Sequence, residues 1–337
     1  MVVEARTPTR IDLSGSTLDL YPLYLFLEGG ITNNAAITLY SNVRIETRDD
    51  TQVHLKSVDT GAELSAPSIA ELPMDRELDF VARVVKFYAP NTGVNVITHN
   101  TTPHGSGLGA SSALLIALTG ALDKVNGTNM PPRDFVDLGA NLEAQAIGIP
   151  TGKQDYLGAL YGGVNALHFG VEGWRQEPLI EDEAKLREFE DQLVLTFTGD
   201  THFSGTNNWN MLKRYIDDAQ GSRQSMKTIA RVSAEMREAL LAFDLDRFAQ
   251  LLDEEWQSRK NLAEGVTTPA IDRMVEAAAA AGALASKING AGGGGCMITF
   301  VEQGKRKPVE AALAEAGATL MPFRIAREGL TVTVEDN

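Results

Sequence analysis

Three glycines at alternate positions, Gly105, Gly107 and Gly109, precede two serines and an apolar run within residues 102–118 of this 337-residue chain. Glycine permits backbone angles that other residues avoid, and it lets a ligand approach the main chain closely. Because the turn opens directly into a predicted helix, several unpaired N–H groups lie at the positive end of the helix dipole. Such an end binds anions, most often phosphate, so the stretch predicts a loop that holds a nucleotide triphosphate. The predicted nucleotide-binding residues are Gly105, Ser106, Gly107, Leu108, Gly109, Ala110, Ser111 and Ser112.

Two other nucleotide-binding patterns fit the chain less well. Residues 105–110 satisfy G-x-G-x-x-A, but that pattern requires a tight turn in a repeating βαβ unit, with an acidic residue about 20 positions on. Here residues 100–104 loosen the turn, and a predicted helix end at 123–127 occupies that position without a second strand. A dehydrogenase is therefore a distant alternative, which a lack of NAD(H) binding would remove. No Walker A sequence occurs, because residues 148–153 have one residue too few between their glycines and Gln154 follows the lysine.

Three further stretches place charged residues among small ones, at 7–19, 143–155 and 287–296. In the first, Arg10 and Asp19 bracket a turn of small residues, and alone they indicate two solvated loop charges. The other two stretches also have ordinary explanations when each is taken singly. Only their combination is informative.

Each candidate residue outside the first stretch also has an ordinary structural explanation. Glu143 fits a surface position on a half-buried helix, and Ser111 fits a helix cap. Asp155 stands at the start of a predicted short helix, where the dipole keeps a carboxylate ionised, and it also fits an N-cap. Glycines 292–295 fit a flexible turn, but they join two strand-like segments, which favours a close approach of the backbone to a ligand.

Together the stretches resemble the three motifs of the GHMP kinase family, which includes galactokinase, homoserine kinase and mevalonate kinase. Residues 7–19 resemble the N-terminal motif, 103–112 resemble the phosphate loop P-x-x-x-G-L-G-S-S-A, and 289–296 resemble the C-terminal glycine motif. Ala110 stands where the first serine often lies, and Ser112 replaces the alanine. The motifs occur in the family's order and span nearly the whole chain.

Within the family, three segments are most similar to the kinases that act on D-glycero-D-manno-heptose 7-phosphate. These segments are residues 10–19, 152–155 and 197–205. Residues 15–19 contain fewer glycines than that subfamily's pattern, which leaves the exact sugar open.

The resemblance implies catalytic roles for four residues. Ser111 and Glu143 resemble the hydroxyl and carboxylate ligands of Mg²⁺, which as a hard cation prefers oxygen. Asp155 resembles the catalytic aspartate that orients and deprotonates the acceptor hydroxyl. Arg10 resembles the basic residue beside it that stabilises charge on the transferred phosphoryl group.

The resemblance also implies a set of substrate contacts. Asp19 resembles the aspartate that binds sugar hydroxyls in galactokinase, and Thr17 lies in the same turn. Lys153 is expected to meet a phosphate on the substrate, although it fits a solvated lysine equally well. Gly292 and Gly293 are expected to contact the substrate through their backbone.

Composition limits the functions available. The chain carries 45 acidic and 30 basic residues, a formal net charge of −15, which argues against nucleic acid or an anionic membrane as the main partner. The single cysteine, Cys296, fits a reducing compartment. The first ten residues lack a signal core, and no run of about 18 apolar residues occurs. We therefore expect a soluble cytoplasmic protein, with a homodimer left open.

Hydrophobic periodicity predicts a strand at 2–12, a hairpin at 34–57 and a helix at 111–125. The second half is predicted to be richer in helix and to return to strands, including one at 319–326. Its predicted helices are 208–220, 224–243, 245–263 and 269–281. The fold expected from the pattern and the resemblance is α+β, with two lobes, 1–180 and 181–337, and the active site between them.

The resulting hypothesis is an ATP- and Mg²⁺-dependent kinase that acts on a sugar or sugar phosphate, with heptose 7-phosphate phosphorylated at its anomeric hydroxyl as the first candidate. One alternative is a GHMP kinase for another small alcohol, such as a hexose, fucose or a mevalonate-like acid. Another is a relative that binds nucleotide or sugar without catalysis. The joint presence of Arg10, Ser111, Glu143 and Asp155 speaks against the second alternative.

Overall fold

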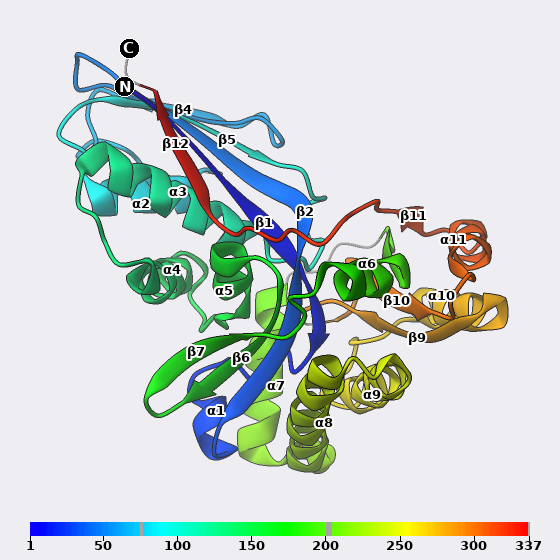
Figure 1. Cartoon of the computed structure of the whole chain (residues 1–337). Coiled ribbons are helices and arrows are strands. Elements are labelled where there is room, and N and C mark those ends of the chain that lie inside the picture. The colour runs from blue at the N-terminus through cyan, green and yellow to red at the C-terminus, as the bar shows by residue number, and fades with distance from the viewer. Residues whose placement is uncertain (75–76, 200–203, 291, 336–337) are drawn as a thin grey trace.

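Two β-sheets with helices packed around them make up the computed structural model of this chain, which describes residues 1–74, 77–199, 204–290 and 292–335 (Figure 1). The larger sheet has the order β12-β1-β2-β5-β3-β4, and β6 and β7 extend it from β2. Its strands are β1 (Val2–Ser14), β2 (Gly30–Thr47), β3 (Val53–Ser57), β4 (Glu63–Ala66), β5 (Val94–Asn100), β6 (Val164–Gly170), β7 (Gly173–Pro178) and β12 (Thr331–Glu335). The smaller sheet has the order β11-β8-β10-β9, formed by β8 (Leu193–Phe197), β9 (Ala283–Ile288), β10 (Cys296–Val301) and β11 (Thr319–Leu320).

The helices that were predicted lie close to their expected positions, whereas α1 and α6 were not predicted. Those of the first half are α1 (Leu23–Phe26), α2 (Asp79–Tyr88), α3 (Ala110–Asn126), α4 (Pro132–Ile147), α5 (Gln154–Tyr161) and α6 (Glu183–Asp191). Those of the second half are α7 (Ser204–Asp217), a 3₁₀ turn (Ala219–Gly221), α8 (Ser222–Ala242), α9 (Leu245–Arg259), α10 (Pro269–Ala281) and α11 (Arg306–Glu315). In the part of the chain that the structure describes, no helix is both long enough and apolar enough to span a membrane.

The long strands β1 and β2 form the spine of the molecule and run side by side through it (Figure 1). Residues 30–35 of β2 pair with β6, whereas residues 41–47 pair with β5. The middle of β1 therefore lies where the part of the larger sheet that contains β5 meets the part that contains β6. Arg10 lies near this junction, opposite Ala36 of β2, and Asp12 lies two residues further on, opposite Asn34.

The hairpin expected at 34–57 is wrong. The two strands form, but β5 inserts between them, antiparallel to β2 and parallel to β3. The chain entering β5 is fastened to the break between β2 and β3, where Gly93 N–H donates to the Asp50 carbonyl at 2.7 Å. A Cβ on Gly93 would lie 2.4 Å from the Gln52 carbonyl oxygen, so only glycine fits there. Period-two alternation identifies strands but does not identify their partners.

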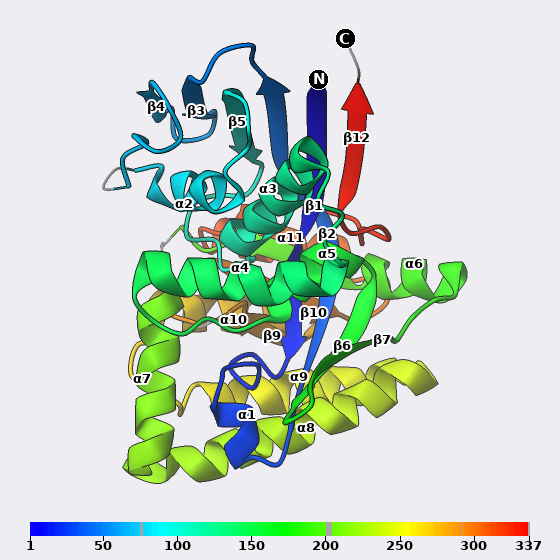
Figure 2. The ribbon, with the colours of Figure 1, turned by 90° about the vertical axis from the view of Figure 1, so that its left-hand side faces the viewer.

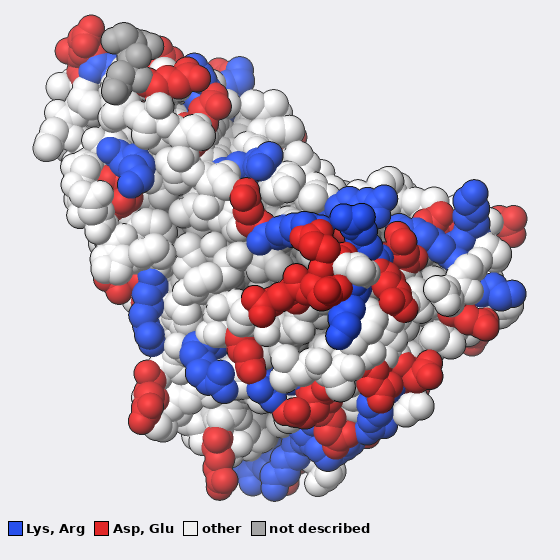
Figure 3. Space-filling view, in the orientation of Figure 1, with Lys and Arg blue, Asp and Glu red and all other residues white. Residues whose placement is uncertain are grey.

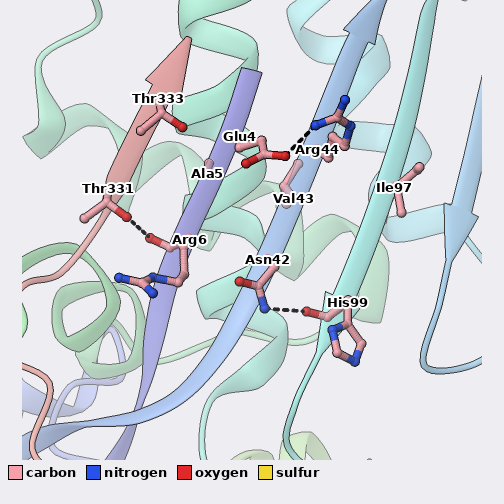
Figure 4. A pocket seen from close by; sticks show the side chains of 10 residues that line it. All are labelled: Glu4, Ala5, Arg6, Asn42, Val43, Arg44, Ile97, His99, Thr331 and Thr333. Carbon is pink, nitrogen blue, oxygen red and sulfur yellow. Dashed lines mark hydrogen bonds and ion pairs between the residues drawn. The ribbon is translucent and has the colours of Figure 1, made fainter. Parts of the chain in front are cut away.

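The part of the larger sheet formed by β12, β1, β2 and β5 has two faces that differ in polarity. Figure 2 shows α2, α3 and α4 over one face, and Val3 and Ala5 of β1 are buried beneath helices. The opposite face carries the alternate side chains of β12, β1, β2 and β5 (Figure 4). They form two cross-strand rows, Thr331–Arg6–Asn42–His99 and Thr333–Glu4–Arg44–Ile97. This alternation is expected of an antiparallel sheet with one covered and one open face.

The two halves of the chain contribute strands to the same sheet and side chains to the same hydrophobic cluster. β12, the last strand of the chain, pairs with β1, which places Glu335 opposite Val2 (Figure 1). One hydrophobic cluster combines Ile11 and Leu13 of β1 with Leu195 of β8, Val232 of α8 and Phe248 of α9. The division into lobes at 1–180 and 181–337 stays a prediction.

Acidic and basic side chains intermingle on the face shown in Figure 3. Ion pairs at the surface of the protein include Arg231 with Glu235 and Arg306 with Glu310. Exposed pairs of this kind contribute about 0–1 kcal/mol each to stability. The charges on this face are therefore of mixed sign and form no single basic patch there.

Candidate active site

A cavity of about 600 Å³ opens beside the glycine-rich loop. All eight predicted loop residues, 105–112, line it, and so do Arg10, Asp19, Glu143 and Asp155. These side chains come from β1, the turn after it, α4 and α5, which are far apart in sequence. The volume is in the range of small-molecule sites.

The loop has the backbone that its glycines predict. Gly105, Gly107 and Gly109 have φ angles of +68°, +72° and +74°, a region that favours glycine. Gly109 is the residue before α3, and no side chain of the described residues caps that helix start. The first N–H groups of α3 are thus available to a phosphate.

The C-terminal glycine motif, residues 289–296, packs directly against the backbone of this loop. Cys296 N–H donates to the Ser106 carbonyl at 2.7 Å. A Cβ on Gly295 would lie 2.6 Å from that same oxygen, and a Cβ on Gly107 would lie 2.9 Å from the Asn289 carbonyl oxygen. The glycines therefore allow two backbone segments to pack directly against each other.

Gly292 and Gly293, expected to contact substrate, do not line the cavity; Gly290 does. Both are buried, and Gly293 N–H donates to the Val266 carbonyl at 2.8 Å. A Cβ on Gly292 would lie 2.7 Å from a Val266 side-chain carbon. Their geometry serves the packing of the motif, and the structure does not bring them to the substrate side.

Arg10 connects the glycine loop to Asp155. Its Nε donates to Asp155 Oδ1 at 2.7 Å, and its Nη2 lies 2.5 Å from the same oxygen. Its Nη1 donates to the Gly107 carbonyl at 2.7 Å. The Arg10 side chain is 4% exposed and that of Asp155 is 26% exposed. The guanidinium therefore positions the carboxylate next to the loop while leaving it accessible.

Glu143 lies beside the start of α3, as the predicted metal pair requires. The hydroxyls of Ser111, Ser112 and Tyr156 hydrogen-bond to its carboxylate, with Ser112 Oγ at 3.0 Å from Oε2. Burial raises the pKa of Glu143, and the hydroxyl contacts act in the opposite direction. Ser111 itself is exposed. The structure thus brings Ser111 and Glu143 together in the cavity.

Tyr156 is a site residue that sequence reasoning missed. Its ring is fully buried, and its hydroxyl donates to Glu143 Oε2. A buried tyrosine needs a partner for its hydroxyl, which is the signal that would have prompted a search for one. Its place beside Asp155 in α5 did not reveal that partner.

Asp19 is held inside the wall of the cavity by a close backbone contact. Its Oδ2 accepts a hydrogen bond from Gln154 N–H at 2.9 Å. A Cβ on Gly152 would lie 2.0 Å from the same oxygen, so glycine is required at that position. Gln154 Nε2 donates to Ser16 Oγ at 2.8 Å, which joins the turn after β1 to the start of α5. Ser16 and Gln154 are further polar residues that sequence reasoning missed.

Burial raises the pKa of Asp19 from 3.8 to about 6, with a smaller contribution from the nearby Asp155. A raised carboxyl pKa stabilises the fold at low pH, and this stabilisation is lost as pH rises through about 6. We expect the free energy of unfolding to fall by an amount on the order of 3 kcal/mol between pH 4 and 7 because of Asp19. Denaturant unfolding of the wild type and Asp19→Asn over that range measures the difference. Parallel pH profiles would contradict the assignment.

Lys153, expected to meet a substrate phosphate, does not line the cavity. Its Nζ lies 2.5 Å from Asp137 Oδ1 of α4. Among the described lining residues, Arg10 is the only lysine or arginine. Thr17 does line the cavity, and its Oγ1 donates to Asn208 Oδ1 of α7 at 3.5 Å.

Part of the cavity lining is apolar. Leu78, Phe80 and Val81 at the start of α2 line it together with Leu114 of α3. An apolar face at helical spacing, such as that of α2, does not by itself distinguish a core residue from a ligand contact.

Comparison with known proteins identifies relatives of this chain. Residues 79–163 match the GHMP kinases N terminal domain, and residues 236–319 match the region described as GHMP kinases C terminal. The chain is 28% identical over 338 residues to D-glycero-alpha-D-manno-heptose 7-phosphate kinase of Campylobacter jejuni, covering 97% of this chain and 98% of that protein. It is 30% identical over 254 residues to a mevalonate kinase of Thermococcus gammatolerans, covering 71% and 69%.

A similar solved structure is a D-glycero-D-manno-heptose 1-phosphate kinase from Bacteroides thetaiotaomicron. It superposes with a TM-score of 0.81 and 25% identity, covering 99% of this chain and all of that one. The predicted α+β fold of the family is thereby confirmed. This chain belongs to the GHMP kinase family and is an ATP-dependent kinase.

Proposed function

We propose that this kinase transfers the γ-phosphate of ATP to the anomeric hydroxyl of a sugar or sugar phosphate. The observation that carries the proposal is the Arg10–Asp155 pair, fixed to the Gly107 carbonyl and exposed to the cavity. The similarity to heptose phosphate kinases over nearly the whole chain supports a sugar acceptor. The single cysteine and the use of ATP support a cytoplasmic location.

In the proposed reaction, the glycine loop and the start of α3 bind the triphosphate through backbone N–H groups. The Asp155 carboxylate accepts the proton of the acceptor hydroxyl, whose oxygen attacks the γ-phosphorus. The bond between that phosphorus and the β–γ bridging oxygen breaks, and ADP leaves. Arg10 offsets negative charge next to the loop during transfer.

The residues around Glu143 fit a Mg²⁺ ion. Ser111 and Glu143 offer oxygen ligands at the mouth of the phosphate loop, which is the chemistry that this cation prefers. Within the described residues, no group of three or more His, Cys, Asp or Glu side chains could hold a metal. One carboxylate shared with substrate phosphates is the usual arrangement for Mg²⁺ in kinases. When bound, the ion neutralises phosphate charge.

Glu143→Gln is expected to raise the Mg²⁺ concentration needed for half-maximal rate by about tenfold or more, since a neutral amide binds the cation less well than a carboxylate. Titrating MgCl₂ at fixed ATP in the wild type and the variant measures this shift. Glu188→Gln, an exposed glutamate on α6, is the matched control. Identical titrations for all three proteins would remove Glu143 from the metal site.

The cavity also favours a second candidate acceptor, an uncharged sugar. Among the described residues that line the cavity, the only permanent cation is Arg10, which is already paired with Asp155. Lys153 is paired with Asp137 outside the cavity. A phosphate on the acceptor would therefore have no free basic side chain among these residues, whereas a neutral sugar needs none.

ADP release in a coupled assay tests the proposal and separates these candidates. The panel contains ATP, Mg²⁺ and either D-glycero-D-manno-heptose 7-phosphate, a free hexose, fucose or mevalonate. Turnover of the heptose phosphate supports the first candidate, and turnover of a free hexose or fucose supports the second. Turnover of mevalonate alone, or of none of these acceptors, would overturn the sugar assignment.

A further inference from the structure

Four charged side chains lie completely buried next to the cavity, and the proposed reaction uses none of them. Asp12 of β1 pairs with Lys287 of β9, and Lys287 Nζ also lies 3.2 Å from Glu255 Oε2 of α9. Glu255 Oε1 accepts from Arg259 Nε at 2.8 Å and from Nη2 at 2.6 Å. All four side chains are 0% exposed. We call them the buried charge cluster.

Such a cluster needs an explanation other than stability. Removing charges from water is unfavourable, and well-packed apolar residues of similar volume are often as stable or more stable. Among the residues that the structure describes, three polar atoms of the cluster have no hydrogen-bond partner: Asp12 Oδ1, Glu255 Oε2 and Arg259 Nη1. If the cluster does not serve stability, it can instead serve to hold a neighbouring segment of the chain in one conformation.

The cluster reaches the cavity through one hydrogen bond. Arg259 Nη2 donates to the Ser16 carbonyl oxygen at 2.8 Å. Ser16 belongs to the turn of residues 15–19, here called the acceptor turn, which contributes Ser16, Thr17 and Asp19 to the cavity. The side chain of Ser16 accepts from Gln154, whose backbone N–H binds Asp19. The guanidinium is therefore connected to the acceptor turn at its centre.

The acceptor turn is strained. Thr17 has a φ of +82°, although it is β-branched and 2% exposed. Such a residue is an outlier in this region, and it persists only where the surroundings hold it. Gly15, also at φ +82°, packs on the Ile31 carbonyl, where a Cβ would lie 2.2 Å from the oxygen. One side of the turn is thus fixed by β2, and Arg259 fixes the other.

We propose that Arg259, oriented by Glu255 and the Lys287–Asp12 pair, is a positioning residue that holds the acceptor turn in its strained conformation. It thereby sets the affinity for the acceptor without touching it. This inference rests on the proposed function in one respect, that the acceptor binds at this turn. It adds a residue on α9 to the determinants of acceptor binding.

The double variant Glu255→Met/Arg259→Met tests the role, because removing both partners avoids leaving a new unpaired charge between them. We expect the KM for the acceptor that the wild type uses to rise about 10- to 100-fold, as for loss of a charged hydrogen bond. The KM for ATP should stay near the wild-type value. The control is Arg306→Met/Glu310→Met, which removes another i,i+4 pair on α11. An unchanged acceptor KM in the Glu255/Arg259 variant would overturn the proposal.

A second measurement needs no acceptor. At φ +82°, glycine at position 17 should be more stable than alanine, whereas at ordinary backbone angles alanine is favoured. We expect Thr17→Gly to exceed Thr17→Ala in unfolding stability in the wild-type background. This preference should shrink or reverse in the Glu255→Met/Arg259→Met background, where the turn relaxes. An equal preference in both backgrounds would overturn the proposal.

The two measurements distinguish this inference from the proposed function. If the wild type uses no sugar of the panel, the proposed function fails, and the comparison at position 17 still decides whether Arg259 holds the turn. If the wild type is active and the double variant matches it in acceptor KM, only the role of Arg259 fails.

Discussion

Replacing Asp155 with asparagine is expected to lower kcat by about 10²- to 10⁴-fold, the usual contribution of a general base. Asparagine keeps the shape of the side chain and can still accept one hydrogen bond from Arg10, but it cannot take up the acceptor proton. The glycine loop and the start of α3 are unchanged, so ATP should bind as in the wild type. Steady-state kinetics and calorimetric titration with ATP measure the two quantities separately.

Asp137→Asn provides the control for this substitution. Asp137 is also a carboxylate paired with a basic side chain, Lys153, but it does not line the cavity. We expect its kcat to remain close to the wild-type value. A wild-type kcat in Asp155→Asn would remove Asp155 from the catalytic role, whereas a joint loss of activity and ATP binding would indicate a structural defect.

Gly109→Ala is expected to lower kcat on the order of 10²-fold, the loss that a displacement of about 1 Å at a reacting group can cause. A Cβ at this position would lie 2.8 Å from Asp155 Cγ and 3.0 Å from its Cβ, too close for either group to stay in place. The residue also has a φ of +74°, which adds backbone strain at the start of α3. The catalytic carboxylate should therefore move away from the loop.

Gly127→Ala separates strain from collision. Gly127 follows the other end of α3 with a φ of +64°, and nothing lies within 4 Å of a Cβ built there. Both variants should lose about 1 kcal/mol of stability from the backbone, measured by denaturant unfolding. Only Gly109→Ala should lose activity. Equal kinetics in the two variants would show that Asp155 tolerates the added methyl group.

The parts of the site that follow one another along the chain could be predicted from the sequence. Gly105, Gly107 and Gly109 indicate positive φ angles directly from the sequence, because few other residues adopt such angles. The resemblance to the family then supplied Arg10 and Asp155 as partners, and the structure brings them together at hydrogen-bond distance. Local patterns also located most helices of the second half within a few residues.

Features that depend on tertiary pairing could not be predicted. Alternation in β2 and β3 does not reveal that β5 inserts between them. Nothing near Lys153 in the sequence indicates that it forms an ion pair with Asp137 on the preceding helix. A glycine in a sequence also has two possible explanations, because the close approach of a ligand and that of a neighbouring segment both need a residue without a Cβ. Gly292 was therefore assigned to substrate although it packs on Val266.

The buried charge cluster shows the same limit at longer range. Asp12, Glu255, Arg259 and Lys287 are spread over most of the chain, and each resembles an ordinary surface charge in its local context. Only the packing of α9 and β9 against β1 brings them together out of water. No pattern in one sequence specifies such a contact, whereas a single structure displays it.

The most direct test of the central claim, phosphoryl transfer to an anomeric hydroxyl at the Arg10–Asp155 pair, is the identity of the product. Phosphorus NMR of the reaction of the wild-type enzyme with ATP, Mg²⁺ and the sugar that it uses should show a new phosphate ester coupled to the proton on the anomeric carbon. The Asp155→Asn enzyme should form it far more slowly. A phosphate coupled to any other position of the sugar, or equal product formation by both enzymes, would contradict the claim.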